Sequence, residues 1–112
     1  SGVHVFTMRD IDERGMGKVG DEVMQIVNDG TAGFHMSFDV DGLDPEVAPG
    51  VGTPVPGGVD YREAHLLLEH CADSERMTSM EVVELNPVLD ERNRSAEVVR
   101  SLVLSAFGQS IL

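Results

Sequence analysis

Two aspartates, Asp39 and Asp41, stand at the end of an apolar stretch in the sequence HMSFDVDGLDP (35–45). If this stretch is a β-strand, residues two apart point to the same face, and the two carboxylates lie about 6 to 7 Å apart at the backbone. Like charges side by side are costly there unless a cation lies between them. Carboxylate oxygens suit hard divalent ions such as Mn²⁺ or Mg²⁺, and a carboxylate can bridge two such ions in a hydrolytic site.

The same aspartates have a simpler interpretation, a solvated junction in which they form ordinary turns. An EF-hand loop counted from Asp39 requires glycine at its sixth position and glutamate at its twelfth, where the sequence has Asp44 and Gly50. A strand ending in D-x-D-G also resembles the aspartate-nucleophile phosphatases of the haloacid dehalogenase type, which require a lysine after the motif. The only lysine, Lys18, precedes it. The metal site and the solvated turn therefore remain as alternatives.

A further acidic residue, Glu84, ends the apolar stretch MTSMEVVEL (77–85). Its carboxylate could bind a cationic substrate group, and a guanidinium is the best geometric match; the alternative is an exposed loop glutamate. The histidines are poor candidates for further ligands. His35 is separated from Asp39 by roughly 13 Å of strand, and His65 and His70 point to different sides of a helix. We expect all four histidines to be surface or core residues: His4, His35, His65 and His70.

Alternating β-forming and helix-forming segments must position these carboxylates. Three segments are rich in β-forming residues and are predicted as strands: 3–8, 34–40 and 77–85. Helical spacing of apolar residues predicts three helices, over 18–30, from Tyr61 onward and over 95–112. Asp60 with Glu63 is expected to form a capping box, and Ser95 is expected to cap the last helix. The Gly/Pro-rich segment 41–58 is expected to hold no regular element. This order predicts an α/β fold, an open parallel β-sheet with flanking helices, in which ligands bind at the carboxyl ends of strands.

Composition restricts the classes of partner. Against 8 basic residues the chain of 112 has 20 acidic ones, a net charge of −12. This charge disfavours nucleic acid and anionic membranes as partners, since both require clustered Lys and Arg. No apolar run reaches the ~18 residues of a transmembrane helix. The single cysteine, Cys71, fits a reducing compartment, the cytoplasm. Because the chain starts with Ser-Gly-Val and enters an apparent strand at once, we expect it to be the C-terminal part of a longer single domain.

Three segments together resemble the ureohydrolase family, and within it the arginases. They are SFDVDGLDP (37–45), GVGTPVPGGVDYRE (50–63) and VVELNP (82–87). The resemblance runs from about Val3 to the end of the chain. It implies the last three strand-and-helix units of an arginase-like α/β fold. It further implies that Asp39 bridges two Mn²⁺ ions, that Asp41 binds one of them, that Thr53 lines the substrate pocket, and that Glu84 faces the guanidinium group.

For the complete protein, the resemblance implies hydrolysis of L-arginine to L-ornithine and urea, and a homo-oligomer, either a trimer or a hexamer. The remaining metal ligands and a proton-shuttling histidine are expected in a missing N-terminal part, so the chain alone is expected to be inactive. Val40, Gly42 and Val55 occupy positions at which agmatinases tend to carry other residues. Arginase is therefore favoured over agmatinase and formiminoglutamase, which remain alternatives together with a non-catalytic truncated or split fragment.

Overall fold

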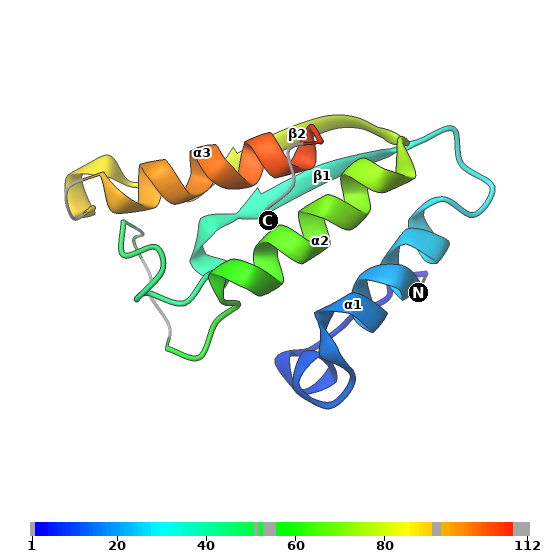
Figure 1. The fold of residues 1–112 in the computed structure, drawn as a ribbon, viewed down its shortest axis with the longest axis horizontal. Coiled ribbons are helices and arrows are strands. Elements are labelled where there is room, and N and C mark those ends of the chain that lie inside the picture. The colour runs from blue at the N-terminus through cyan, green and yellow to red at the C-terminus, as the bar shows by residue number, and fades with distance from the viewer. Residues whose placement is uncertain (1, 51, 53–55, 91–92, 109–112) are drawn as a thin grey trace.

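The computed structural model describes residues 2–50, 52, 56–90 and 93–108, which form three helices and a small parallel sheet (Figure 1). In chain order the elements are α1 (Met8–Val27), β1 (Phe34–Asp39), the 3-10 turn η1 (Val40–Gly42), α2 (Tyr61–Ser74), β2 (Met77–Val83), the 3-10 turn η2 (Pro87–Leu89) and α3 (Arg94–Ala106). Within this described part, no helix has the length and apolar character needed to cross a membrane. The predicted α/β class with a parallel sheet is confirmed.

The sheet has one covered face. β1 pairs in parallel with β2, and Asp39 at the end of β1 lies opposite Val83 at the end of β2. Along β1, half-buried residues alternate with exposed ones, as expected for a strand with one side on a core. Helices α2 and α3 lie on that side (Figure 1). The core between them and the sheet contains seven buried residues: Val40, Leu43, Ala48, Ala64, Leu68, Leu102 and Ala106.

Helix α2 begins as the sequence predicts. The Asp60 carboxylate accepts the backbone N–H of Glu63 at 2.8 Å, and the Glu63 carboxylate accepts the backbone N–H of Asp60 at 3.1 Å. The pair satisfies two of the N–H groups that a helix start leaves without intrahelical partners. The carboxylates therefore fix where the loop after β1 ends and α2 begins.

The prediction of a strand over 3–8 is wrong. In the described part, the segment before Thr7 pairs with no strand, and Val3 and Val5 remain 75% and 76% exposed. Thr7 instead caps α1: its hydroxyl accepts the Asp10 N–H at 3.2 Å, and the Asp10 carboxylate accepts the Thr7 N–H at 2.7 Å. A strand requires a hydrogen-bonded neighbour, and none is present there. The helix predicted over 18–30 therefore starts earlier, at Met8, with a kink at Gly15, where φ is +80°.

The assignment of Ser95 as a helix cap is also wrong. Helix α3 starts at Arg94, after Asn93, whose side chain makes no capping hydrogen bond. The first-turn N–H groups are instead satisfied by Asp90, whose carboxylate accepts the N–H of Ser95 at 2.9 Å and that of Ala96 at 3.1 Å. A carboxylate also suits the positive end of the helix dipole. The predicted end of this helix, 109–112, lies outside the described residues.

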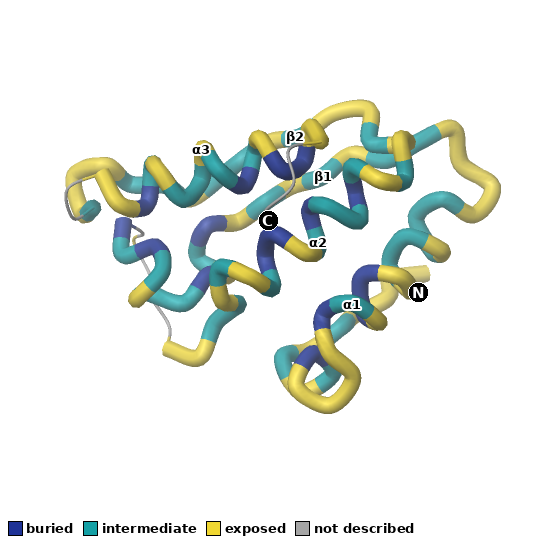
Figure 2. The backbone as a smooth tube through the Cα atoms, in the orientation of Figure 1, coloured by how far each residue is buried: buried dark blue, intermediate teal, exposed yellow. Residues whose placement is uncertain are grey.

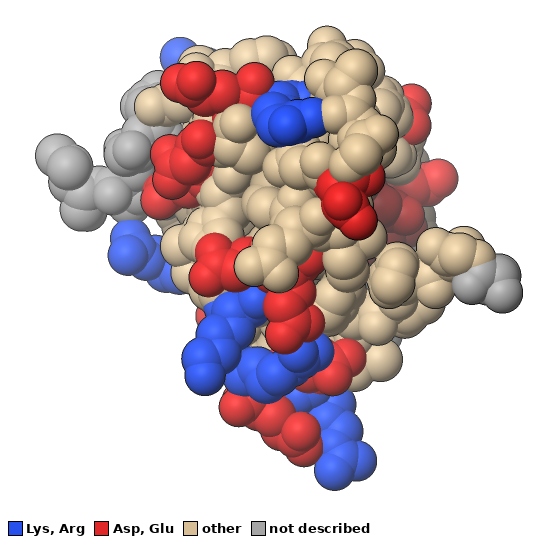
Figure 3. All heavy atoms as spheres, turned by 90° about the vertical axis from the view of Figure 1, so that its right-hand side faces the viewer, with Lys and Arg blue, Asp and Glu red and all other residues tan. Residues whose placement is uncertain are grey.

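Helix α1 packs on α2 and is less deeply buried than the sheet core (Figures 1 and 2). Its small cluster consists of Ile11, Met16 and Val19. Its exposed side carries ion pairs of Arg9 with Glu13 and of Arg14 with Glu22. Figure 3 shows basic side chains gathered in the lower part of one face, with acidic side chains among them.

Candidate functional site

The carboxyl ends of both strands meet at one edge of the sheet. Asp39 is the last residue of β1, and Glu84 directly follows Val83, the residue that pairs with Asp39. Both side chains are exposed. In a parallel sheet this edge is where ligands bind. The structure therefore places two of the acidic residues singled out in the sequence side by side, although 45 positions separate them.

Glu84 has an unusual backbone conformation. Its φ is +67°, in the left-handed region that non-glycine residues rarely adopt. Such a conformation costs of order 1–3 kcal/mol and is often found at functional sites. Glu84 therefore ends β2 with a turn of the chain, and the predicted strand 77–85 stops two residues early, at Val83.

The two aspartates are brought together by a turn, and not by strand alternation as predicted. β1 ends at Asp39, and Val40–Gly42 form a 3-10 turn. Asp39 Oδ1 accepts the backbone N–H of Asp41 at 2.9 Å, a local side-chain-to-backbone bond typical of aspartate before a turn. Val40, which lies between them in the sequence, is fully buried, and the 3-10 turn begins at this residue. Asp39 and Asp41 are neighbours at the edge, but not on one strand face.

The donor chemistry of Asp39 and Asp41 fits part of a site for a hard divalent cation. An ionised carboxylate has two oxygens with about four lone pairs, so Asp39 can accept one backbone N–H and still bind a cation. Ions such as Mn²⁺ prefer octahedral oxygen coordination, which needs more donors than two side chains supply. Among the described residues, no three His, Cys, Asp or Glu side chains are grouped so that they could hold a metal. These residues fit a metal site that is completed from outside them.

The loop after β1 is held together by Asp44. Its carboxylate accepts the N–H of Glu46 at 2.9 Å and that of Gly57 at 3.1 Å. Its backbone N–H donates to Val59 O at 3.0 Å, and the Val59 N–H donates to Gly42 O at 2.9 Å. Apart from η1, the described part of 41–58 contains no helix or strand, which agrees with the prediction. Thr53, the predicted pocket residue, lies outside the described residues.

His35, His65 and His70 each contact a neighbouring element, while His4 is exposed. His35 is exposed on β1, where its Nδ1 lies 2.7 Å from Ser79 Oγ. His65 is buried and bonds through Nδ1 to Ser105 Oγ of α3 at 2.5 Å. His70 joins α2 to α1, with Nε2 at 3.2 Å from Gly17 O and 3.1 Å from Asp21 Oδ1.

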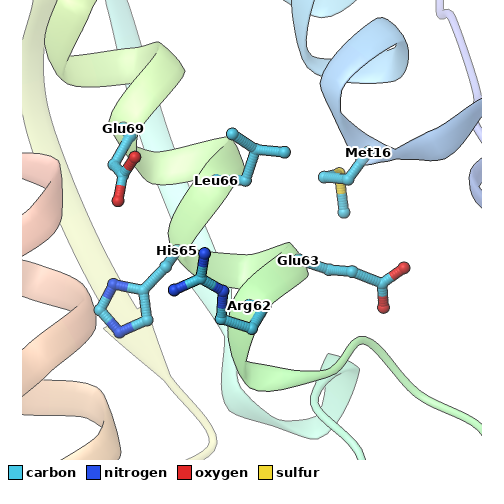
Figure 4. Close-up of a pocket in the computed structure, with 6 residues that line it drawn as sticks. All are labelled: Met16, Arg62, Glu63, His65, Leu66 and Glu69. Carbon is cyan, nitrogen blue, oxygen red and sulfur yellow. The ribbon is translucent and has the colours of Figure 1, made fainter. Parts of the chain in front are cut away.

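A cavity of about 240 Å³ lies along α2. Its lining residues are Met16, Arg62, Glu63, His65, Leu66 and Glu69. Figure 4 shows the His65 ring turned toward α3, while Leu66 lies on the side of α2 that faces Met16 of α1. Burial lowers the pKa of His65 below its ordinary value, with Arg62 adding to this effect and Glu69 opposing it. The cavity contains neither Asp39 nor Glu84, and we do not assign it to the site.

Sequence reasoning missed the residues that connect α3 to the site. Ser95 was expected to be a cap, but its hydroxyl accepts the N–H of Gly50 in the loop after β1. Gly50 in turn accepts the N–H of Asn86, two residues after Glu84. An acidic residue a few positions before a helix start, here Asp90, was the available signal that the cap comes from elsewhere.

Comparison with known proteins identifies the family. The Arginase family model matches residues 1–108. The arginase of Brevibacillus brevis is 51% identical over 111 residues, which are 99% of this chain and 37% of that protein. A crystal structure of arginase from Bacillus subtilis superposes with a TM-score of 0.95 at 47% identity, covering 100% of this chain and 41% of that one.

A structure of formimidoylglutamase from Bacillus subtilis also superposes, with a TM-score of 0.88 at 30% identity over 94% of this chain and 33% of that one. The chain therefore spans between a third and about two fifths of the length of these relatives. The family match covers nearly all of the chain, and the fold agrees with it. The chain belongs to the arginase family.

Proposed function

We propose that the chain is the C-terminal part of a single arginase-like α/β domain whose complete protein hydrolyses L-arginine to L-ornithine and urea. The observation that carries the proposal is the meeting of Asp39, Asp41 and Glu84 at the carboxyl edge of the sheet. Support also comes from relatives that are named arginases and are about half identical to this chain. Acidic residues gathered at such an edge suit both a divalent cation and a cationic substrate.

Each acidic residue has a separate role in this proposal. Asp39 would help to hold both Mn²⁺ ions and Asp41 would help to hold one, with the remaining ligands supplied from outside the chain. Bound manganese supplies an activated water and stabilises developing negative charge. Glu84 accepts charge-assisted hydrogen bonds from the guanidinium group and orients it toward the metal side. Thr53 contributes to the pocket wall.

A second candidate is another amidine hydrolase of the same family. The similarity to formimidoylglutamase is specific enough to keep formiminoglutamate as a possible substrate, and agmatine is the other alternative. All three substrates carry an amidine or guanidine carbon, so the chemistry at the metal side is shared. The substrates differ at the end remote from that carbon. The rates at which the complete protein hydrolyses each substrate therefore decide between the candidate activities. We further propose that the complete protein is cytoplasmic and that it is a homo-oligomer, either a trimer or a hexamer. Sedimentation analysis of the complete protein tests the oligomeric state.

The test of the proposed function offers arginine, agmatine and formiminoglutamate separately to the complete protein, purified with Mn²⁺. Urea release is measured for arginine and agmatine, and formamide release is measured for formiminoglutamate. Arginine is expected to give the highest kcat/KM. Glu84→Gln should lower kcat/KM for arginine about 10- to 150-fold, because one charge-assisted contact is worth roughly 1.5–3 kcal/mol, and should leave the manganese content unchanged. Glu81→Gln, which changes an exposed glutamate of β2, is the matched control. Equal rates for Glu84→Gln and the wild type would contradict the role of Glu84.

A further inference from the structure

A buried serine of α3 contacts the loop at the acidic edge. Ser95 lies in the first turn of α3 and is 0% exposed. Its hydroxyl oxygen accepts the backbone N–H of Gly50 at 2.6 Å, although the two residues are 45 positions apart. A buried backbone N–H without a partner costs about 1–3 kcal/mol. The Ser95 hydroxyl therefore stabilises one defined position of Gly50 against α3.

Gly50 also contacts the segment that follows β2. Its carbonyl oxygen accepts the backbone N–H of Asn86 at 2.7 Å, so its two backbone polar groups connect α3 to the segment that follows β2. A Cβ atom at position 50 would lie 2.8 Å from Cβ and Cγ of Asp90 and 3.0 Å from Ser95 Oγ. Only glycine allows the loop to approach α3 so closely.

Asp90 fixes the serine itself. Its carboxylate accepts the N–H groups of Ser95 and Ala96 at 2.9 and 3.1 Å. The same carboxylate lies against Gly50. Ser95 therefore presents its hydroxyl from a helix start at which two backbone N–H groups, including its own, are bound by Asp90.

Glu84 lies between two anchors as a result. On one side it follows Val83, which is paired with Asp39 in the sheet. On the other side, Asn86 is bound by Gly50, and the Asn86 side chain accepts the N–H of Val88 at 3.1 Å to start η2. The left-handed conformation of Glu84 is costly and persists only where the chain on both sides is fixed.

We propose that Ser95 is a positioning residue for the substrate side of the site: through Gly50 and Asn86 it holds the backbone of Glu84 in its left-handed conformation at the carboxyl edge. The effect on substrate rests on the proposed function. The backbone connection from Ser95 to Asn86 does not, and the two parts are tested separately.

The first test measures amide hydrogen exchange in this chain. Ser95→Ala removes the acceptor of the Gly50 N–H, and exchange at Gly50 and Asn86 should become about 3- to 10-fold faster, the loss expected for one hydrogen bond. Ser95→Thr, which keeps the hydroxyl, should restore slow exchange. Ser101→Ala removes a hydroxyl from the half-buried side of the same helix and is the matched control. Unchanged exchange at Gly50 in Ser95→Ala, or equal acceleration in Ser101→Ala, would overturn the connection.

The second test uses the complete protein with arginine. Ser95→Ala should raise KM about 3- to 10-fold with unchanged manganese content, because Glu84 is less well placed, and Ser95→Thr should restore KM. Loss of folded protein alone would lower the apparent kcat and leave KM unchanged, so that result would overturn the substrate role of Ser95. If the wild type releases no urea from arginine, the proposed function fails, while the exchange measurement still decides the connection.

Discussion

The sheet with α2 and α3 differs from α1 in how its parts are joined. The core of the first region contains side chains that are fully buried, such as Leu68 and Val40, and its two strands are joined by backbone hydrogen bonds. The cluster of α1 is shallower, and Ile11 is still 8% exposed. α1 is joined to α2 by side chains, chiefly His70. The difference indicates that the region carrying the acidic edge is the more stable one, while α1 is docked on it and opens more readily.

The largest expected difference between the two regions comes from their cores. Leu68→Ala should cost about 2–5 kcal/mol of unfolding free energy, because Leu68 is fully buried and its removal leaves a cavity. Ile11→Ala should cost less, because its cluster lies near solvent and can relax. Urea unfolding of both variants, followed by circular dichroism, measures the two losses. A larger loss for Ile11→Ala would reverse the ranking of the regions.

A smaller effect is expected where α1 meets α2. A Cβ at Gly20 would lie 2.8 Å from Cδ2 of His70, so Gly20→Ala should force the helices apart and cost about 1–3 kcal/mol. At Gly17 the nearest atom would be a Leu66 methyl at 3.8 Å, an ordinary contact. Gly17→Ala should therefore stabilise the helix by about 0.5–1 kcal/mol. Urea unfolding again gives both values, and hydrogen exchange should become faster in α1 of Gly20→Ala only. Equal effects of both substitutions would show that α1 does not pack as closely on α2 as described.

The third prediction concerns pH and the interface of α2 with α3. Burial lowers the pKa of His65 in the folded chain below its value of about 6.5 in the unfolded chain. As the pH falls below about 6.5, the unfolded chain therefore takes up the proton first, and the stability contributed by neutral His65 is lost as the pH falls through the folded pKa. The urea concentration at the midpoint of unfolding should therefore be lower below about pH 6.5 than at pH 7.5. His65→Gln should weaken this dependence. A pH dependence that is the same in His65→Gln as in the wild type would contradict the assignment.

Much of the first region can be predicted from the sequence, because its signals are local. The apolar stretches 34–40 and 77–85 do become paired strands, and the Asp60 capping box needs only residues three apart. The same local signals mislead before α1. The segment 3–8 has the composition of a strand, but a strand also depends on a hydrogen-bonded neighbour far away in the sequence. Without that neighbour, Thr7 and Asp10 start a helix.

At the acidic edge, formed by Asp39, Asp41 and Glu84, local sequence again predicts only part of the structure. The position of Asp39 and Glu84 at strand ends follows from the sequence pattern, because apolar stretches end there. The turn between Asp39 and Asp41 does not, since it depends on the burial of Val40 against α2 and α3. The role of Ser95 is likewise invisible in the sequence, because its partner, Gly50, comes from a loop 45 positions earlier.

The central claim is that the carboxyl edge of the sheet is the metal side of the site, and the manganese content of the complete protein tests it most directly. Asp39→Asn and Asp44→Asn each remove one negative charge from the same stretch, but only Asp39 is assigned to the metal, while Asp44 binds backbone N–H groups of the loop. The wild type and Asp44→Asn should retain manganese after dialysis, and Asp39→Asn should lose most of it together with urea production. Manganese content in Asp39→Asn equal to that of the wild type would contradict the claim.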